Sequence, residues 1–202
     1  MQDILDAYAA AATPGFIATY DALPTAAIYA QVIDLFPRHA TRIIDIGAGT
    51  GRDAAWFADR GHHVLAVEPV RELREAGRLL HPSTAITWLD DRLPDLASAR
   101  SHDPFGFVLL GGVWQHLTDA ARRIAMPHLA SLAESGSRLV LSLRHGPAPG
   151  GRRVFPVDPD ETVSQAAASG LHLIRQRETA SLQPGNQAMN VRWTWLAFEK
   201  LD

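Results

Sequence analysis

The chain has 202 residues, of which 47% are hydrophobic and 20% charged, a composition typical of a globular domain. Its net charge of -3 argues against non-specific binding to nucleic acid, which usually needs a basic surplus. The absence of cysteine excludes disulfides, thiolate catalysis and cysteine-ligated zinc, and it fits a cytoplasmic protein.

No apolar run approaches the roughly 20 residues that span a bilayer, and the first residues lack the basic region of a signal peptide. We therefore expect a cytoplasmic protein with neither a membrane nor a nucleic-acid partner, and the oligomeric state stays open. The length favours a single domain over residues 1–202.

The first part of the chain, residues 3–36, is predicted to be helical. Apolar residues recur at helical spacing up to Phe36, and Pro37 ends the pattern. A break at residues 13–15, which read Thr-Pro-Gly, divides a short arm from a packed helix. We expect residues 1–37 to form a helical arm or lid on a core made by residues 38–202.

Strands and helices then alternate along the chain. Strands are expected at residues 42–46, 63–68, 85–89, 105–110 and 138–143. Helices are expected between them at residues 54–59, 71–80 and 118–134, and Pro127 should kink the last of these or start a new one. The continuously apolar run 105–110 is typical of a strand buried on both faces.

The last part of the chain differs in character. Residues 146–151 are rich in glycine and proline, which predicts a mobile loop. The run from Asp158 to Glu161 is typical of a helix start, and Gly170 should end that helix. Strands predicted at 171–177 and 191–200 have no predicted helix between them, so they should pair antiparallel.

The most specific motif joins the first strand to the next helix. Asp45 is followed by glycines at alternate positions, Gly47, Gly49 and Gly51. Glycine removes the side chain where a backbone must approach a ligand. The fingerprint of nicotinamide-binding folds is Gly-x-Gly-x-x-Gly, and the chain matches it poorly. Counted from Gly47, the third glycine would fall on Arg52, and counted from Gly49, on the alanine at position 54. That alanine variant keeps a nicotinamide-dependent oxidoreductase open as an alternative.

The pattern from Asp45 to Gly51 resembles the glycine loop of class I S-adenosylmethionine-dependent methyltransferases, and the similarity extends over residues 25–200. The resemblance implies an α/β fold with a Rossmann-like doubly wound sheet of seven strands, mostly parallel with an antiparallel C-terminal hairpin, and helices on both faces. It also implies S-adenosylmethionine as cofactor and S-adenosylhomocysteine as product. A carboxylate such as that of Asp45 suits the cofactor's cationic amine better than an amide nest would.

The resemblance extends to the loops after the next strands. An acid that closes the second strand, here Glu68, accepts hydrogen bonds from both ribose hydroxyls in this family, and a carboxylate has two oxygens for that diol. Asp90 or Asp91, after the third strand, would accept the adenine amino group. The remaining cofactor residues that the resemblance implies are Ala48, Pro69, Leu93, Gly111 and Gly112.

Candidate catalytic and substrate residues lie near the expected mouth of the site. His116 and His145 could each accept a proton near neutral pH, or they could be a packed residue and a loop residue. Trp114 could stack on the acceptor or belong to the core. Tyr20 lies on the arm, which often folds over the cofactor in this family. Arg144 suits a carboxylate or phosphate, although a solvated basic loop is an equally simple explanation.

Two motifs are missing from the sequence, and their absence limits the class of methyl acceptor. Residues 111–114 read Gly-Gly-Val-Trp, whereas many enzymes of this family that methylate nucleobase or glutamine nitrogens carry Asn/Asp-Pro-Pro-aromatic there. No metal-ligand spacing is present either. We predict a metal-independent methyltransferase that acts on a small molecule, with an anionic acceptor as one option. A binding module without transfer activity is the alternative. Arg52 and Asp53 are expected to cap the following helix or lie on its surface.

Overall fold

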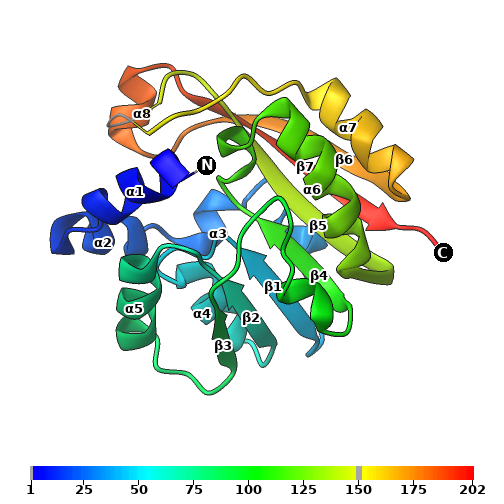
Figure 1. Ribbon diagram of the computed structural model, residues 1–202, viewed down its shortest axis with the longest axis horizontal. Helices are drawn as coiled ribbons and strands as arrows, with labels where there is room; N and C mark the ends of the chain where they lie inside the picture. The colour runs from blue at the N-terminus through cyan, green and yellow to red at the C-terminus, as the bar shows by residue number, and fades with distance from the viewer. Residues whose placement is uncertain (1, 149–151) are drawn as a thin grey trace.

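The computed structural model describes residues 2–148 and 152–202, so the second half of the glycine- and proline-rich loop predicted at 146–151 lies outside the described residues. The chain forms a seven-stranded sheet in the order β3-β2-β1-β4-β5-β7-β6 (Figure 1). Its strands are β1 (Arg42–Ile46), β2 (His63–Val67), β3 (Ile86–Leu89), β4 (Phe105–Leu110), β5 (Ala133–His145), β6 (Leu171–Ala180) and β7 (Arg192–Lys200).

Strands β1 to β5 pair in parallel, whereas β7 pairs antiparallel with both β5 and β6. This arrangement confirms the predicted doubly wound sheet with an antiparallel C-terminal pair. The helices are α1 (Gln2–Ala11), α2 (Pro14–Asp21), α3 (Thr25–Ile28), α4 (Arg52–Ala58), α5 (Arg71–Leu80), α6 (Asp119–Ser131), α7 (Pro159–Ala168) and α8 (Pro184–Ala188), with 3₁₀ turns η1 (Ile33–Leu35), η2 (Ala99–Ser101) and η3 (Trp114–His116).

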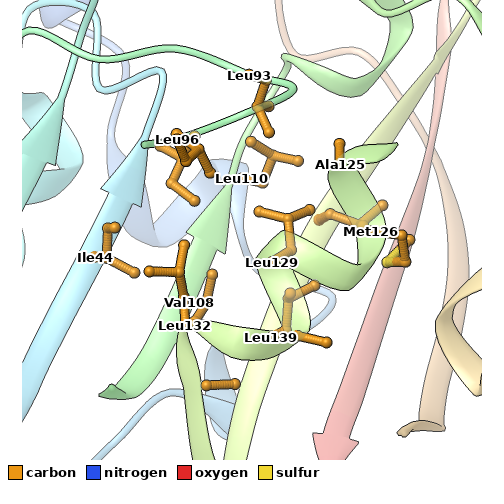
Figure 2. Close-up of a cluster of buried hydrophobic side chains, with 14 of the residues drawn as sticks. Ile44, Leu93, Leu96, Val108, Leu110, Ala125, Met126, Leu129, Leu132 and Leu139 are labelled. Atoms are coloured by element: carbon orange, nitrogen blue, oxygen red, sulfur yellow. The ribbon is translucent and has the colours of Figure 1, made fainter. Parts of the chain in front are cut away.

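Alternation along each strand separates two hydrophobic cores, one on each face of the sheet. Ile44 and Val108 point to the face covered by α6 and α7, and their neighbours Ile43 and Phe107 point to the face covered by α4. Figure 2 shows the first core, where side chains from β1, β4 and β5 meet Leu129 of α6. Helices on both faces explain why β4 carries no polar side chain along its length.

Helix α6 ends earlier than the sequence predicts. It begins after Thr118, whose side chain accepts the backbone N–H of Ala121, and it runs through Pro127 without ending. The predicted end at residue 134 is wrong, because the chain from Ala133 onward already pairs with Phe105 of β4. The backbone N–H and C=O groups from Ala133 onward form hydrogen bonds in the sheet, in place of those that another helical turn would have made.

The predicted packed helix at 25–36 is broken into α3 and η1. Tyr29 ends α3 and buries its ring against Trp195, with ring centroids 4.9 Å apart. In the C-terminal part, Asp158 caps α7 as predicted, and Gly170 follows that helix with φ of +77°. The connection between β6 and β7 contains α8, which the sequence did not indicate, and the two strands still pair antiparallel.

Parallel strands bring their carboxyl ends to one edge of the sheet, and the loops after β1, β2 and β4 therefore meet there. Helices α1 and α2 lie over this edge (Figure 1). Within the described ranges, no helix has the length and apolarity that a membrane crossing requires.

Candidate active site

A cavity of about 100 Å³ lies at the carboxyl edge of β1, β2 and β4; we call it the glycine-loop cavity. Its walls come from the loops after these strands, from the loop after β3, and from helices α1, α2 and α5. The residues of the predicted cofactor site that line it are Gly47, Gly49, Glu68, Pro69, Asp91, Leu93, Gly111 and Gly112, and Tyr20 joins them. The structure thus gathers residues that lie far apart in the sequence.

The glycine loop reaches this cavity with its backbone. Gly47 and Gly49 have φ of +75° and +58°, a region that L side chains rarely adopt. A Cβ at residue 47 would overlap Val113, and one at residue 49 would lie 3.3 Å from the Tyr20 ring. The N–H of Gly47 is bound to the carbonyl of Val67 at 2.8 Å, which fixes the loop to β2. Close approach and unusual backbone angles both explain why glycine is needed here.

Glu68 connects the glycine loop to the start of α5. One carboxylate oxygen accepts the N–H of Gly49 and the other accepts that of Val70, each at 2.8 Å. Burial raises the pKa of Glu68 to about 7, although both N–H groups favour the ionised form. Each oxygen keeps a second lone pair, so the side chain can still accept a pair of neighbouring hydroxyls.

Asp45 is a buried acid whose hydrogen bonding is incomplete. It is 3% exposed, and within the described residues its Oδ2 has no hydrogen-bond partner. Burial, and then the negative charge of Asp53, raise its pKa well above the usual range. A buried acceptor without a donor costs free energy, and a cationic amine nearby would remove that cost. Asp45 is not among the residues that line the cavity.

The structure distinguishes the two candidate adenine residues. Asp90 is paired with Arg74 at 2.8 Å and does not line the cavity. Asp91 lines it, and its Oδ2 accepts the N–H groups of Ser98 and Ala99. Ala48 and Gly51 also do not contribute to the cavity surface, since Gly51 precedes α4 as its cap.

A second cavity of about 210 Å³ adjoins the first and is bounded by β5, β6 and β7; we call it the hairpin cavity. Both cavities are lined by Tyr8, Phe16, Tyr20, Gly111, Gly112 and His116, so they meet at these residues. The hairpin cavity extends from this junction to Arg144, Trp193 and Asn186. Two adjoining cavities suit a reaction between two bound molecules.

His116 and Tyr8 form a hydrogen-bonded pair at the junction. Nδ1 of His116 lies 2.8 Å from the carbonyl oxygen of Arg153, and Nε2 lies 3.0 Å from the Tyr8 hydroxyl. Because a carbonyl only accepts, Nδ1 carries the proton, and Nε2 accepts from the hydroxyl. Burial lowers the pKa of His116, so the neutral ring is favoured.

Two predicted site residues lie elsewhere. Trp114 is fully buried and belongs to the core on the α6 face, so the prediction that it contacts substrate is wrong. His145 lines neither cavity, and its Nε2 lies 2.7 Å from the Thr194 hydroxyl. His145 follows Arg144 on β5, and since adjacent strand residues face opposite sides, only Arg144 reaches the hairpin cavity.

The tryptophans that do line the hairpin cavity are Trp193 and Trp195 on β7. Sequence analysis missed them, although their alternate spacing within a strand places both on one face. Tyr8 was also predicted only as part of the arm. Its role depends on His116, more than a hundred positions away in sequence, and local spacing carries no information about such a contact.

The expectation for Arg52 and Asp53 also needs correction. The Asp53 carboxylate is buried and accepts hydrogen bonds from Thr25 and Tyr29 at 2.8 Å, and from Arg52 at 2.7 Å. This cluster ties the N-terminal segment to the start of α4. Asp21 continues the attachment, because it accepts from the Thr50 hydroxyl at 2.8 Å.

His81 adds a further contact to the arm, with its Nε2 2.9 Å from Asp21. These contacts attach the end of α2 to the glycine loop and to the end of α5. In residues 2–148 and 152–202, no group of three or more histidine, cysteine or acidic side chains is placed to hold a metal ion.

Comparison with known proteins identifies the family. A family model described as a methyltransferase domain matches residues 18–198. An uncharacterized methyltransferase of Mycobacterium tuberculosis (strain H37Rv) is 34% identical over 113 residues, which cover 55% of this chain and 43% of that protein. The matched region is thus less than half the length of that relative.

Solved structures share the fold. The 1,6-didemethyltoxoflavin-N1-methyltransferase of Burkholderia thailandensis, with bound 1,6-didemethyltoxoflavin and S-adenosylhomocysteine, has a TM-score of 0.71 at 18% identity, covering 92% of this chain and 81% of that one. A putative S-adenosylmethionine-dependent methyltransferase of Listeria monocytogenes has a TM-score of 0.70 at 13% identity, covering 89% of this chain and all of the other.

The family match confirms the predicted family, and the solved structures confirm the predicted Rossmann-like architecture. The predicted S-adenosylmethionine cofactor agrees with them, since the Burkholderia enzyme holds S-adenosylhomocysteine, the product form of that cofactor. With a model match that extends over residues 18–198, the chain belongs to the methyltransferase domain family.

Proposed function

We propose that the chain is a metal-independent methyltransferase that moves a methyl group from S-adenosylmethionine to a small-molecule acceptor. The observation that carries the proposal is the junction of two cavities at Gly111 and Gly112. The glycine-loop cavity would hold the cofactor, and the hairpin cavity would hold the acceptor. The bound small molecule in the Burkholderia enzyme of the same fold supports this class of acceptor.

The residues of the glycine-loop cavity fit the cofactor. Glu68 would accept the ribose hydroxyls, and the unpartnered oxygen of Asp45 would take a bond from the amino group, directly or through water. Asp91 and Leu93 would lie against the adenine. When bound, the cofactor supplies a methyl group on a positively charged sulfur, which is already activated for transfer.

The protein's own contribution would be alignment, which can supply about 7–11 kcal/mol of barrier reduction. The hairpin cavity would hold the acceptor's nucleophile toward Gly111 and Gly112. Where the acceptor must lose a proton, Tyr8 and His116 would take it up: the proton passes to the Tyr8 oxygen as the Tyr8 proton moves to Nε2 of His116. His145 has no part in this step, because it lines neither cavity.

We further propose that residues 1–37 act as a lid on a single domain. Tyr8, Phe16 and Tyr20 from this segment line both cavities, and the Asp53 cluster holds the segment in place. Excluding water at the junction would strengthen every electrostatic contact inside it.

The test is transfer of labelled methyl from S-adenosylmethionine to a broad panel of small phenols, amines and carboxylic acids. We expect labelled product at an unchanged rate when a metal chelator is added. If S-adenosylhomocysteine binds but no panel member is labelled, the chain is a binding module and the proposed activity is wrong. Loss of transfer with the chelator would contradict metal independence.

The same assay over a range of pH tests His116, which is faced by Tyr8, Arg144 and Arg152. A neutral imidazole is the base, and burial lowers its pKa, so wild-type transfer should fall only below the ordinary histidine pKa of about 6.5. We expect His116→Gln to lower the rate about 100-fold or more above that pH, since general bases contribute about 10²–10⁴-fold, and to remove the fall at low pH. An unchanged rate and profile would remove His116 from the mechanism.

A further inference from the structure

The hairpin cavity has an unbalanced charge. Arg52, Arg144 and Arg152 line it, and no aspartate or glutamate is found among its described lining residues. Arg52 is neutralised by Asp53 at 2.7 Å. Arg152 lies over the rings of Tyr8 and Phe16, 4.9 and 5.3 Å from their centroids. Arg144 remains as the cation whose surroundings point to a ligand.

Arg144 is buried against neutral groups. The residue is 6% exposed, and its Nη2 donates to the carbonyl of Pro147 at 2.9 Å and to the Oδ1 of Asn186 at 3.1 Å. Its Nε is buried and has no partner among the described residues. A buried cation that meets only neutral acceptors carries a desolvation cost, which an anion from outside would offset.

The partners of Arg144 are themselves fixed. The amide nitrogen of Asn186 donates to the Ser181 hydroxyl at 3.1 Å and to the Gln183 side chain at 2.6 Å, so its oxygen is directed at Arg144. Trp193 lies against the guanidinium: the distance from Cζ of Arg144 to the centroid of the Trp193 ring is 5.6 Å. Neighbouring groups therefore hold the Arg144 side chain in place. Such fixed placement is typical of a side chain that recognises a ligand.

The distance from the reaction end to Arg144 sets the size of the acceptor. The hydroxyl of Ser142 accepts the N–H of Gly112 at 2.8 Å, which places Ser142 beside the junction of the two cavities. Arg144 lies two residues farther along β5, so the Cα atoms of Ser142 and Arg144 are about 7 Å apart at the usual rise of a strand. Trp193 and Trp195 line the space, so a flat ring would fill it.

We propose that the acceptor is a small aromatic carboxylate, with its carboxylate bound by Arg144 and its nucleophile held at Gly112. This inference rests on the proposed function and specifies its substrate class. A guanidinium fork matches the two oxygens of a carboxylate. The aromatic walls supply the apolar contact, and one ring separates the two ends by about the required length.

Calorimetry with S-adenosylhomocysteine at saturation tests the proposal. The probes are 4-hydroxybenzoate, its neutral analogue 4-hydroxybenzamide, and phenyl phosphate. We expect the acid to bind wild type about 10- to 100-fold more tightly than the amide, which is the usual contribution of a charge-assisted hydrogen bond. Arg144→Met should abolish this preference, and Arg144→Lys, which retains the charge, should keep part of it.

The matched control is Arg192→Met, since Arg192 is an exposed arginine on the neighbouring strand that does not line the cavity. It should keep the full preference. The inference is overturned if wild type binds S-adenosylhomocysteine but shows no preference for the acid, if Arg144→Met keeps that preference, or if phenyl phosphate binds more tightly. If wild type does not bind S-adenosylhomocysteine at all, the proposed function fails instead, so the two failures are distinguishable.

Discussion

A Gly49→Val chain is expected to fold but to bind S-adenosylhomocysteine at least about 100-fold more weakly than wild type. Gly49 lines the glycine-loop cavity with φ of +58°, and a Cβ there would lie 3.3 Å from the Tyr20 ring. The two further methyl groups of valine would occupy cofactor space or push the lid away. Overpacking costs about 1–3 kcal/mol, and the displaced Gly49 N–H would also lose its bond to Glu68.

The matched control is Gly61→Val. Gly61 has φ of +84°, and nothing lies within 4 Å of the position of its Cβ. Both variants therefore carry the backbone strain of a left-handed L residue, about 1–2 kcal/mol, but only one of them fills the cavity. Calorimetric titration with S-adenosylhomocysteine should show wild-type affinity for Gly61→Val. Equal affinities of the two variants would mean that the glycine loop does not contact the cofactor.

An Asp53→Ala chain should lose about 3–5 kcal/mol of its free energy of unfolding, as is usual when one partner of a buried ion pair is removed. The guanidinium of Arg52 would stay buried without its counter-charge, and the hydroxyls of Thr25 and Tyr29 would lose their acceptor. Urea unfolding followed by circular dichroism measures the loss. Because the same contacts hold the N-terminal segment, cofactor affinity should fall as well.

Asp59→Ala is the control for this variant. Asp59 lies at the other end of α4 and is exposed. Its side chain makes no hydrogen bond within the described residues. Its removal should change the free energy of unfolding by no more than about 0.5 kcal/mol. A similar small change for Asp53→Ala would show that the cluster does not anchor the segment.

The sequence predicts most of the fold because the sheet depends on local patterns. A continuous apolar run marked β4, and the glycine loop marked the turn between β1 and α4. The strand order follows from the family resemblance. Errors arose where tertiary contacts overrode propensity: Tyr29 turned inward to Asp53 and ended α3, and Ala133 left a helical pattern to pair with β4.

The candidate site was predictable where it depends on backbone geometry and much less so where it depends on side-chain direction. Glycine spacing identified the loop, and the strand end identified Glu68. By contrast, Trp114 turned into the core, which no spacing around it indicated. His145 faces away from the cavity because β5 extends to it, whereas the strand was predicted to end at residue 143. The pairing of Tyr8 with His116 depends on how the arm folds back over the sheet.

Thermal unfolding with added cofactors shows whether this chain binds S-adenosylmethionine or a dinucleotide. At about 100 times its dissociation constant, a ligand adds roughly 2.7 kcal/mol of stability, which for a chain of this size raises the melting temperature by roughly 5–10 °C. We expect that rise with S-adenosylhomocysteine and none with nicotinamide adenine dinucleotide. A rise with the dinucleotide and none with S-adenosylhomocysteine would contradict this expectation.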